Sequence, residues 1–300
     1  MALPSPGYSL LRTLMAALCL TLALSACSPR QLIIDGVANE LASQGAAPED
    51  DLELAREASA FYLKLSESML RSSPDNRPLA AAVTAGFTQY AFAFVAFEAE
   101  QVESRDARKA KALRDRAARL YARAQRHGLS ALERRYPGLL QTLSTRDPAD
   151  WPRLSTDEVG LAYWTAAAWG SWIALSKHDP EIVANLPQVI HLARLTWQSD
   201  PDWGQGALAS LMGSLELSRP GGSRAAALRY FDRAIVLAGE QSAGPWVAKA
   251  EAIALAAGDK EGFKQLLQRA ITIATRTHNL QNEAMLARAR WLLANADELF

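Results

Sequence analysis

The sequence has very little cysteine, and what it has lies at one end. Cys19 and Cys27 are the only cysteines among 300 residues, and both fall in the first tenth of the chain. They cannot crosslink a domain further along, and they supply no cysteine-based metal site there. A disulfide framework and a cysteine-ligated metal are therefore excluded for the rest of the chain.

An excess of charge of either sign is also missing. The chain carries 32 Lys and Arg against 32 Asp and Glu, a formal net charge of zero. At the level of the whole chain this gives no electrostatic case for nucleic-acid binding. A hydrophobic fraction of 49% with 21% charged residues argues against disorder and against a polytopic membrane protein. Glycine and proline are sparse, 17 and 14 residues, which favours helix.

The apolar run near the N-terminus is short. Residues 14–24 would form about 16 Å of helix, roughly half of a ~30 Å hydrocarbon core. The run is preceded by a segment with one charge, Arg12. This pattern is typical of the hydrophobic region of a signal peptide and not of a membrane span.

The residues after this run resemble a bacterial lipoprotein box. Leu24-Ser25-Ala26-Cys27 places a hydrophobic residue and two small ones before a cysteine. The resemblance implies that residues 1–26 are removed, and that Cys27 receives a diacylglyceryl thioether and an amine-linked acyl chain such as palmitate. Together these groups carry three acyl chains, which would make the membrane anchor effectively permanent. The alternative is an ordinary secretory signal, which would leave Cys27 unpaired in an oxidising compartment.

The residue after the cysteine bears on localisation. An aspartate there often signals retention in the inner membrane, and this chain has Ser28. We therefore expect an anchored protein that faces the periplasm, with the outer membrane favoured over the inner.

Helical periodicity runs through the mature chain. In 104–127, apolar residues recur at three- and four-residue steps among arginines and lysines, and we predict that this helix ends at Gly128. No alternating strand pattern bounded by hairpin turns stands out, so the predicted fold class is all-α. The other predicted helices are 50–72, 78–101, 156–177, 180–197, 204–217, 222–239, 245–257, 259–275 and 280–296.

A weak internal repeat accompanies these helices. The offsets 0, +4 and +7 recur with small or aromatic residues at several places along the chain. Small residues at such positions let paired helices approach closely, which is the logic of the tetratricopeptide (TPR) repeat. An irregular bundle with chance spacing is the alternative. The residues that share the offsets are Ala117, Tyr121 and Ala124; Ala227, Phe231 and Ala234; Phe263, Leu267 and Ala270; and Leu186, Ile190 and Ala193.

These patterns give a domain plan. Residues 1–26 are the predicted cleaved signal peptide, and 27–48 a lipidated tether with a first helix. Residues 49–300 are predicted to form one all-α domain of TPR-like helical hairpin repeats, an α-solenoid or a compact helical-repeat domain. The prolines and Trp151 of segment 128–156 indicate an irregular insertion there.

Several motifs together resemble the T-component family of TRAP transporters, the tripartite ATP-independent periplasmic transporters. The resemblance spans about residues 50–275. It implies a periplasmic helical-repeat lipoprotein whose partner is the extracytoplasmic solute-binding subunit. It also implies homotrimers with pores or clefts for an apolar ligand. The motifs are Gly86-Phe87-Thr88-Gln89-Tyr90-Ala91-Phe92, the block from Tyr163 to Trp172, Asp179-Pro180, Asp202-Trp203-Gly204-Gln205-Gly206-Ala207 and Arg229-Tyr230-Phe231-Asp232-Arg233-Ala234.

The sequence contains little that suggests catalysis. Its four histidines lie far apart and in no metal-ligand spacing. His127 and His178 fall at predicted helix ends, where we expect them to interact with the C-terminal carbonyls. Neither a nucleophile elbow nor a phosphate-binding loop occurs. We therefore predict a protein that is not an enzyme and that uses no cofactor and no metal.

The basic run 105–126 is interpreted as a solvated helix face. A surface that binds nucleic acid would need aromatic residues among the charges, and Tyr121 belongs to the apolar stripe instead. Contact with anionic lipid or an acidic partner is the alternative interpretation.

Aromatic residues give the best clue to a binding site. Three tryptophans crowd one short helix, on more than one of its faces. Plain core packing is one interpretation, and a wall that faces a ligand or a partner is the other. The candidate pocket residues are Tyr90, Trp164, Trp169, Trp172, Asn185 and Trp203.

Two functions follow as hypotheses. The first is a lipoprotein subunit of a TRAP-type uptake system that docks the solute-binding protein and passes an apolar or organic-acid ligand. The second is a TPR-like scaffold for envelope protein assembly that handles no ligand. The transported ligand, the oligomeric state and the number of true repeats do not follow from the sequence.

Overall fold

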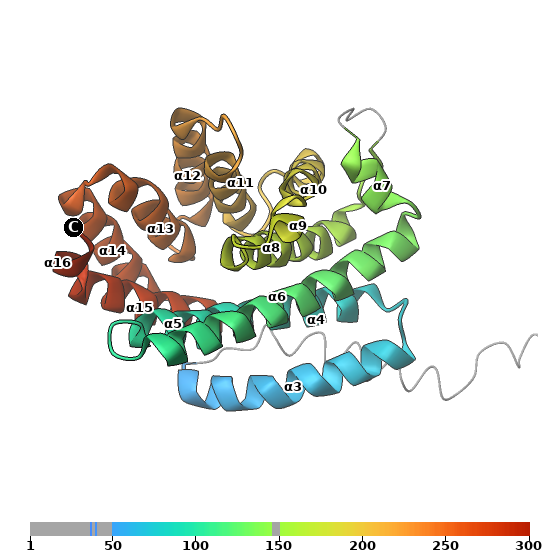
Figure 1. The fold of residues 1–300 in the computed structure, drawn as a ribbon, viewed down its shortest axis with the longest axis horizontal. Coiled ribbons are helices and arrows are strands. Elements are labelled where there is room, and N and C mark those ends of the chain that lie inside the picture. The colour runs from blue at the N-terminus through green and yellow to red at the C-terminus, as the bar shows by residue number, and fades with distance from the viewer. Residues whose placement is uncertain (1–36, 38–39, 41–49, 146–150) are drawn as a thin grey trace, which may run out of the picture.

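The computed structural model describes residues 37, 40, 50–145 and 151–300 (Figure 1). All regular structure in these ranges is helical, which confirms the all-α prediction. The predicted signal peptide, the lipidation site Cys27 and nearly all of the 27–48 tether lie outside the described residues. The TPR-like solenoid arrangement stays a prediction.

The helices follow one another with short connections. Four short π-helical or 3-10 segments, labelled η, adjoin the α-helices of the described residues. The elements are α3 (Leu52–Ser72), α4 (Arg77–Tyr90), η2 (Ala91–Ala96), α5 (Phe97–Val102), α6 (Ala107–Arg135), α7 (Leu139–Ser144), η4 (Thr156–Glu158), α8 (Val159–Leu175), α9 (Pro180–Val183), α10 (Leu186–Ser199), α11 (Ala207–Ser218), α12 (Arg224–Ala238), α13 (Gly244–Lys249), η5 (Ala250–Ala254), η6 (Leu255–Ala257), α14 (Lys260–Ala274), α15 (Leu280–Ala294) and α16 (Ala296–Leu299).

Helix starts follow from local side-chain chemistry. The carboxylate or amide oxygen of an Asp or Asn, or a serine hydroxyl, accepts a hydrogen bond from a backbone N–H in the first turn of most of the longer helices. Such caps stabilise a helix by about 1 kcal/mol each. They explain why most predicted boundaries agree with the structure to within a few residues. The capping residues include Asp51, Asn76, Asp106, Asp179, Ser223, Asp259 and Asn279.

The prediction that a helix ends at Gly128 is wrong. Helix α6 continues to Arg135, and Gly128 lies within it. A Cβ at this position would lie 2.1 Å from the Thr165 hydroxyl of α8 and 3.0 Å from a methyl of Thr84 in α4. Glycine is therefore required because three helices meet here, and not because the helix stops. The first part of the predicted insertion 128–156 is consequently regular helix.

His127 does not interact with a helix end either. Its Nε2 lies 2.8 Å from the Glu67 carboxylate of α3. Lys64 and Arg123 also donate to Glu67, whose side chain is 4% exposed. Burial raises the pKa of this carboxyl, but the hydrogen bonds from Arg123, Lys64 and His127 outweigh it and lower the pKa to about 2. The contact ties α3 to α6.

The positions predicted from the repeat are buried in three of the four sets; in the fourth, Ala193 is buried but Leu186 and Ile190 are only partly buried. The set on α6, the set on α12 and the set on α14 are each at most 3% exposed. Between α11 and α12, a Cβ at Gly213 would lie 2.9 Å from the Phe231 ring. Gly213, which was not part of the predicted pattern, thus lets α11 and α12 approach closely, and close pairing at the alanines of the repeat stays a prediction.

The hydrophobic core is divided. The largest cluster includes side chains from α3, α4, α6, α7, α8, α10 and α11. A second cluster takes all of its buried residues from 243–296. A third, with Ala91, Val95, Ala117 and Tyr121, lies between η2 and α6. The C-terminal helices therefore have a core of their own.

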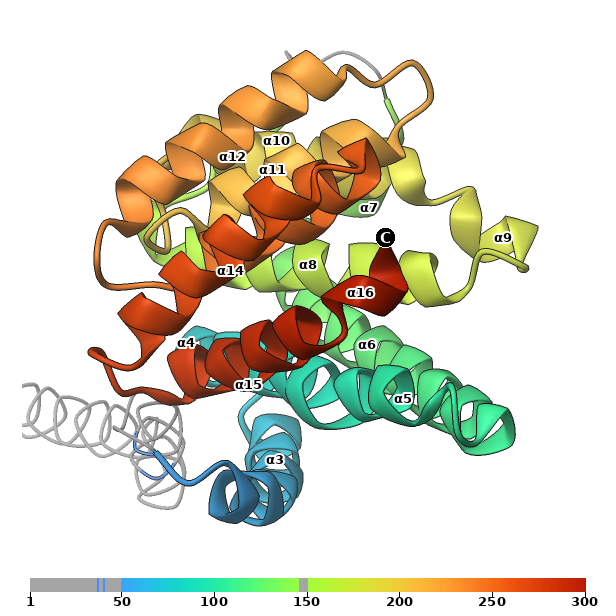
Figure 2. The ribbon, with the colours of Figure 1, turned by 90° about the vertical axis from the view of Figure 1, so that its left-hand side faces the viewer.

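Helix α15 joins the C-terminal helices to the N-terminal ones. It contacts α3 and pairs with α14, and Figure 2 shows it beside the N-terminal helices. The rings of Phe97 and Trp291 meet edge to face, with centroids 5.7 Å apart. We call this contact between α15 and the α3–α5 region the seam.

A buried arginine stands at the seam. Arg288 is 7% exposed and donates to both oxygens of Glu251 in η5, at 3.0 and 2.6 Å, and to Glu100 of α5 at 3.0 Å. The rings of Phe92 and Phe97 lie on its guanidinium, with centroids 5.5 and 5.4 Å away. Burial raises the pKa of Glu100, and Arg288 opposes this only in part.

The helix from Arg77 to Val102 is long and apolar enough to cross a membrane by length and composition alone. It comprises α4, η2 and α5, and more than half of its most apolar stretch is buried against other helices. This is the pattern of the core helix of a folded domain.

Candidate functional site

The predicted pocket residues do not form a single group. Trp169 is 2% exposed and belongs to the largest core cluster. Its indole N–H is buried and has no hydrogen-bond partner in the described part of the chain. Trp169 is therefore a packing residue of α8.

Trp172 and Tyr90 share surroundings. Both are partly buried, and both pack against the largest cluster and against the small cluster between η2 and α6. Tyr121 of that small cluster is nearly fully buried, and burial raises its pKa far above the ordinary value. Trp172 thus bridges two parts of the core and keeps one part of its ring at the surface.

Trp164 and Trp203 are connected through Tyr163. The centroids of Tyr163 and Trp203 are 4.4 Å apart, and those of Tyr163 and Trp164 are 4.9 Å apart. A Cβ at Gly160 would lie 3.2 Å from the Trp203 ring, so the ring lies directly over the α8 backbone. The structure therefore brings these three rings together as a half-buried group.

Asn185 lies apart from this group. Its amide donates to the carbonyls of Glu181 at 2.7 Å and Ile182 at 3.2 Å. These bonds hold the break between α9 and α10, where a single helix was predicted over 180–197. The side chain of Asn185 is thus engaged by the local backbone.

Arg233 extends the aromatic group to α12. It pairs with Asp202, at 2.5 Å, beside Trp203, and its guanidinium lies 5.2 Å from the centroid of Trp197. Trp197 meets the Tyr230 ring edge to face at 5.2 Å. All five aromatic side chains are half-buried. We call the set the aromatic face: Tyr163, Trp164, Trp197, Trp203, Tyr230 and Arg233.

The turn before α11 positions Trp203. Gly204, Gln205 and Gly206 all have positive φ, at 69°, 50° and 87°. A Cβ at Gly206 would lie 2.2 Å from the Ala234 carbonyl oxygen of α12. Glycine at this position allows the turn to press against α12 and brings Trp203 back over α8.

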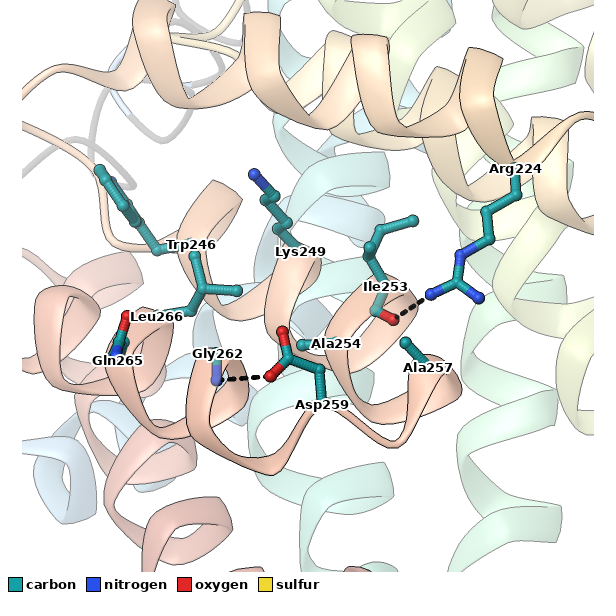
Figure 3. A pocket seen from close by; sticks show the side chains of 10 residues that line it. All are labelled: Arg224, Trp246, Lys249, Ile253, Ala254, Ala257, Asp259, Gly262, Gln265 and Leu266. Atoms are coloured by element: carbon teal, nitrogen blue, oxygen red, sulfur yellow. Dashed lines mark hydrogen bonds between the residues drawn. The ribbon is translucent and has the colours of Figure 1, made fainter.

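Away from this face, a hollow of about 400 Å³ lies between α12, α13 and α14 (Figure 3). Most of its polar groups already have partners, although the buried indole N–H of Trp246 has none among the described residues. Arg224 donates to the Ile253 carbonyl at 3.1 Å, Lys249 pairs with Asp232 at 2.6 Å, and Asp259 accepts from the Gly262 N–H at 2.9 Å. The Asp259 contact caps α14, and the other two join α12 to α13 and η5, so all three are structural contacts.

Sequence reasoning identified only part of the aromatic face. Of its members, only Trp164 and Trp203 were among the predicted pocket residues, and Tyr163, Trp197, Tyr230 and Arg233 were missed. The signal that was available is the motif from Arg229 to Ala234, which contributed only to the family resemblance. The long-range pairs of Arg288 have no signal in a single sequence.

Comparison with known proteins gives one family. The family model described as TRAP transporter T-component matches residues 48–300. An uncharacterized protein of Treponema pallidum (strain Nichols) is 26% identical over 266 residues, which cover 84% of this chain and 81% of that protein.

Proposed function

The chain belongs to the TRAP transporter T-component family, and from this we propose that it is a periplasmic lipoprotein subunit that docks the extracytoplasmic solute-binding protein. The family is a transporter component and not an enzyme family. The family match over 48–300 is the observation that carries the proposal. A lipid anchor at Cys27 holds the subunit at the membrane, preferentially the outer one, and docking raises the local concentration of the loaded receptor.

We assign the docking to the aromatic face. Tryptophan, tyrosine and arginine are the residues most enriched among those that dominate binding energy at interfaces. Here five half-buried rings and Arg233 form one connected surface, which α8, α10, α12 and the turn before α11 hold in place. Since the rings are already packed against one another, a partner pays little conformational entropy to bind them.

Docking is tested by copurification from membranes. The tagged full-length protein should bring down a solute-binding protein, and Trp164→Ala and Arg233→Ala should each reduce the recovered amount at least tenfold. Phe61→Ala is the matched control, because Phe61 is an aromatic residue 68% exposed on α3.

Two results would contradict this assignment. One is loss of the receptor with Phe61→Ala while the aromatic-face variants bind as the parent does. The other is recovery of envelope assembly proteins in place of a solute-binding protein, which favours the scaffold function. The homotrimer and the passage of an apolar or organic-acid ligand stay predictions of the family resemblance.

The anchor is tested separately. Cys27→Ser should remove the acceptor of the lipid, so the protein should remain uncleaved or become soluble. Metabolic labelling with a fatty-acid probe measures this directly. A Ser variant that still carries the label would show that Cys27 is not the lipidated residue.

A further inference from the structure

A second hollow of about 400 Å³ lies where the end of α7 faces α10. Its polar lining comes from Ser144, Gln188, His191 and Arg194, and its apolar lining from Ala184 and Pro187. No carboxylate lines it among the described residues. The side chains from α10 recur at three- and four-residue steps, so one face of the helix supplies them.

His191 is held in a defined orientation. Its Nδ1 lies 2.7 Å from the Leu143 carbonyl oxygen. A carbonyl only accepts, so Nδ1 carries the proton, and Nε2 of the neutral ring is left as an acceptor. The Trp151 ring packs on the imidazole at a centroid distance of 4.9 Å and limits its rotation.

Gln188 presents a second acceptor. Its side-chain oxygen is buried and has no hydrogen-bond partner in the described ranges. An unpaired buried amide oxygen destabilises the folded protein, so a donor supplied from outside the chain would be bound favourably. Ser144 gives its hydroxyl proton to the Leu140 carbonyl at 3.0 Å, and its oxygen remains a third acceptor.

Arg194 supplies a positive charge and hydrogen-bond donors. Its guanidinium is exposed, and among the described residues no carboxylate forms an ion pair with it. The carboxylate that influences it, Glu216, is bound by both Nε and an Nη of Arg219 at 2.6 Å. Arg194 is therefore available to bind an external carboxylate with two parallel hydrogen bonds.

We propose that this hollow binds a free α-amino acid. The ammonium has three N–H donors, and the residues that line the hollow carry three acceptor atoms: Gln188 Oε1, His191 Nε2 and Ser144 Oγ. The ligand's carboxylate binds Arg194, and its side chain lies against Ala184 and Pro187. The volume suits a molecule of this size. A site for a simple anion would carry donors in place of the three acceptors.

The test is isothermal titration of the purified protein, lacking its signal peptide, with each of the twenty standard amino acids. At least one should bind. Its N-acetyl derivative lacks the ammonium and its amide lacks the carboxylate, and each should bind at least tenfold more weakly. Gln188→Leu and Arg194→Gln should each lower the affinity for the amino acid that binds at least tenfold. Arg229→Gln, which replaces an exposed arginine on α12, should leave the affinity unchanged.

Three outcomes would overturn the proposal. The first is that none of the twenty amino acids binds. The second is that the N-acetyl derivative binds as well as the amino acid, which shows a carboxylate site without ammonium recognition. The third is that Arg194→Gln binds as tightly as the parent protein, which moves the site elsewhere. Circular dichroism of each variant shows that lost binding is not lost folding.

Discussion

Replacement of Arg288 by leucine should lower the free energy of unfolding by about 3–5 kcal/mol. The leucine removes a guanidinium that bonds to Glu251 and Glu100 and that two phenyl rings cover. Glu100 and Glu251, whose side chains are 39% and 29% exposed, then lose the cation that they share and are left as two carboxylates that repel each other. The seam holds the C-terminal core against the N-terminal helices. Without these ion pairs, the two parts should unfold in separate transitions. We expect two transitions in urea where the parent protein shows one.

Arg290→Leu is the matched control. Arg290 lies on the same helix and is exposed, so its replacement should change the free energy of unfolding by no more than about 0.5 kcal/mol. Urea unfolding followed by circular dichroism measures both variants. Equal stabilities for Arg288→Leu and Arg290→Leu would show that the seam does not depend on the buried ion pairs.

Trp169→Ala should also destabilise the protein by about 3–5 kcal/mol, because the side chain is 2% exposed within the largest core cluster. Removing it leaves a cavity that the surrounding helices fill only in part. Trp169→Phe should recover part of the loss, since a phenyl ring occupies much of the same volume. Thermal melting of both variants beside the parent measures the effect.

Trp172→Ala should behave differently from Trp169→Ala. Trp172 is only partly buried, so fewer contacts are lost and the variant should remain folded at 25 °C. If its outward ring faces a ligand, this variant loses binding of a fluorescent fatty acid while it keeps its fold. Equal melting temperatures for Trp172→Ala and Trp169→Ala, with both far below the parent, would make the two tryptophans equivalent core residues.

The helices could be predicted from the sequence, but the way in which they pack against one another could not. Periodicity and capping residues are local, so Asp51, Ser223 and Asn279 mark helix starts without knowledge of the fold. Gly128 misled because glycine ends helices and also permits close packing, and only the neighbouring Thr165 shows which applies.

The candidate site shows the same limit. The crowding of tryptophans in 163–172 correctly marked a region of aromatic contacts, but helix phase could not show that Trp169 points into the core and Trp164 towards Tyr163. The partnership of Arg233 with Asp202 depends on how a turn packs on a later helix. Such pairs depend on the tertiary fold, and they cannot be predicted from a single sequence.

The seam also determines when the fold can be completed. The ribosome makes Phe92, Phe97 and Glu100 early. Their contact residues at the seam, Arg288 and Trp291, are among the last to be made. Closing so long a stretch of chain costs entropy before its contacts are gained. A nascent chain therefore carries an uncovered apolar edge until its final helices arrive, and a chain that stops short of α15 keeps that edge permanently open to aggregation.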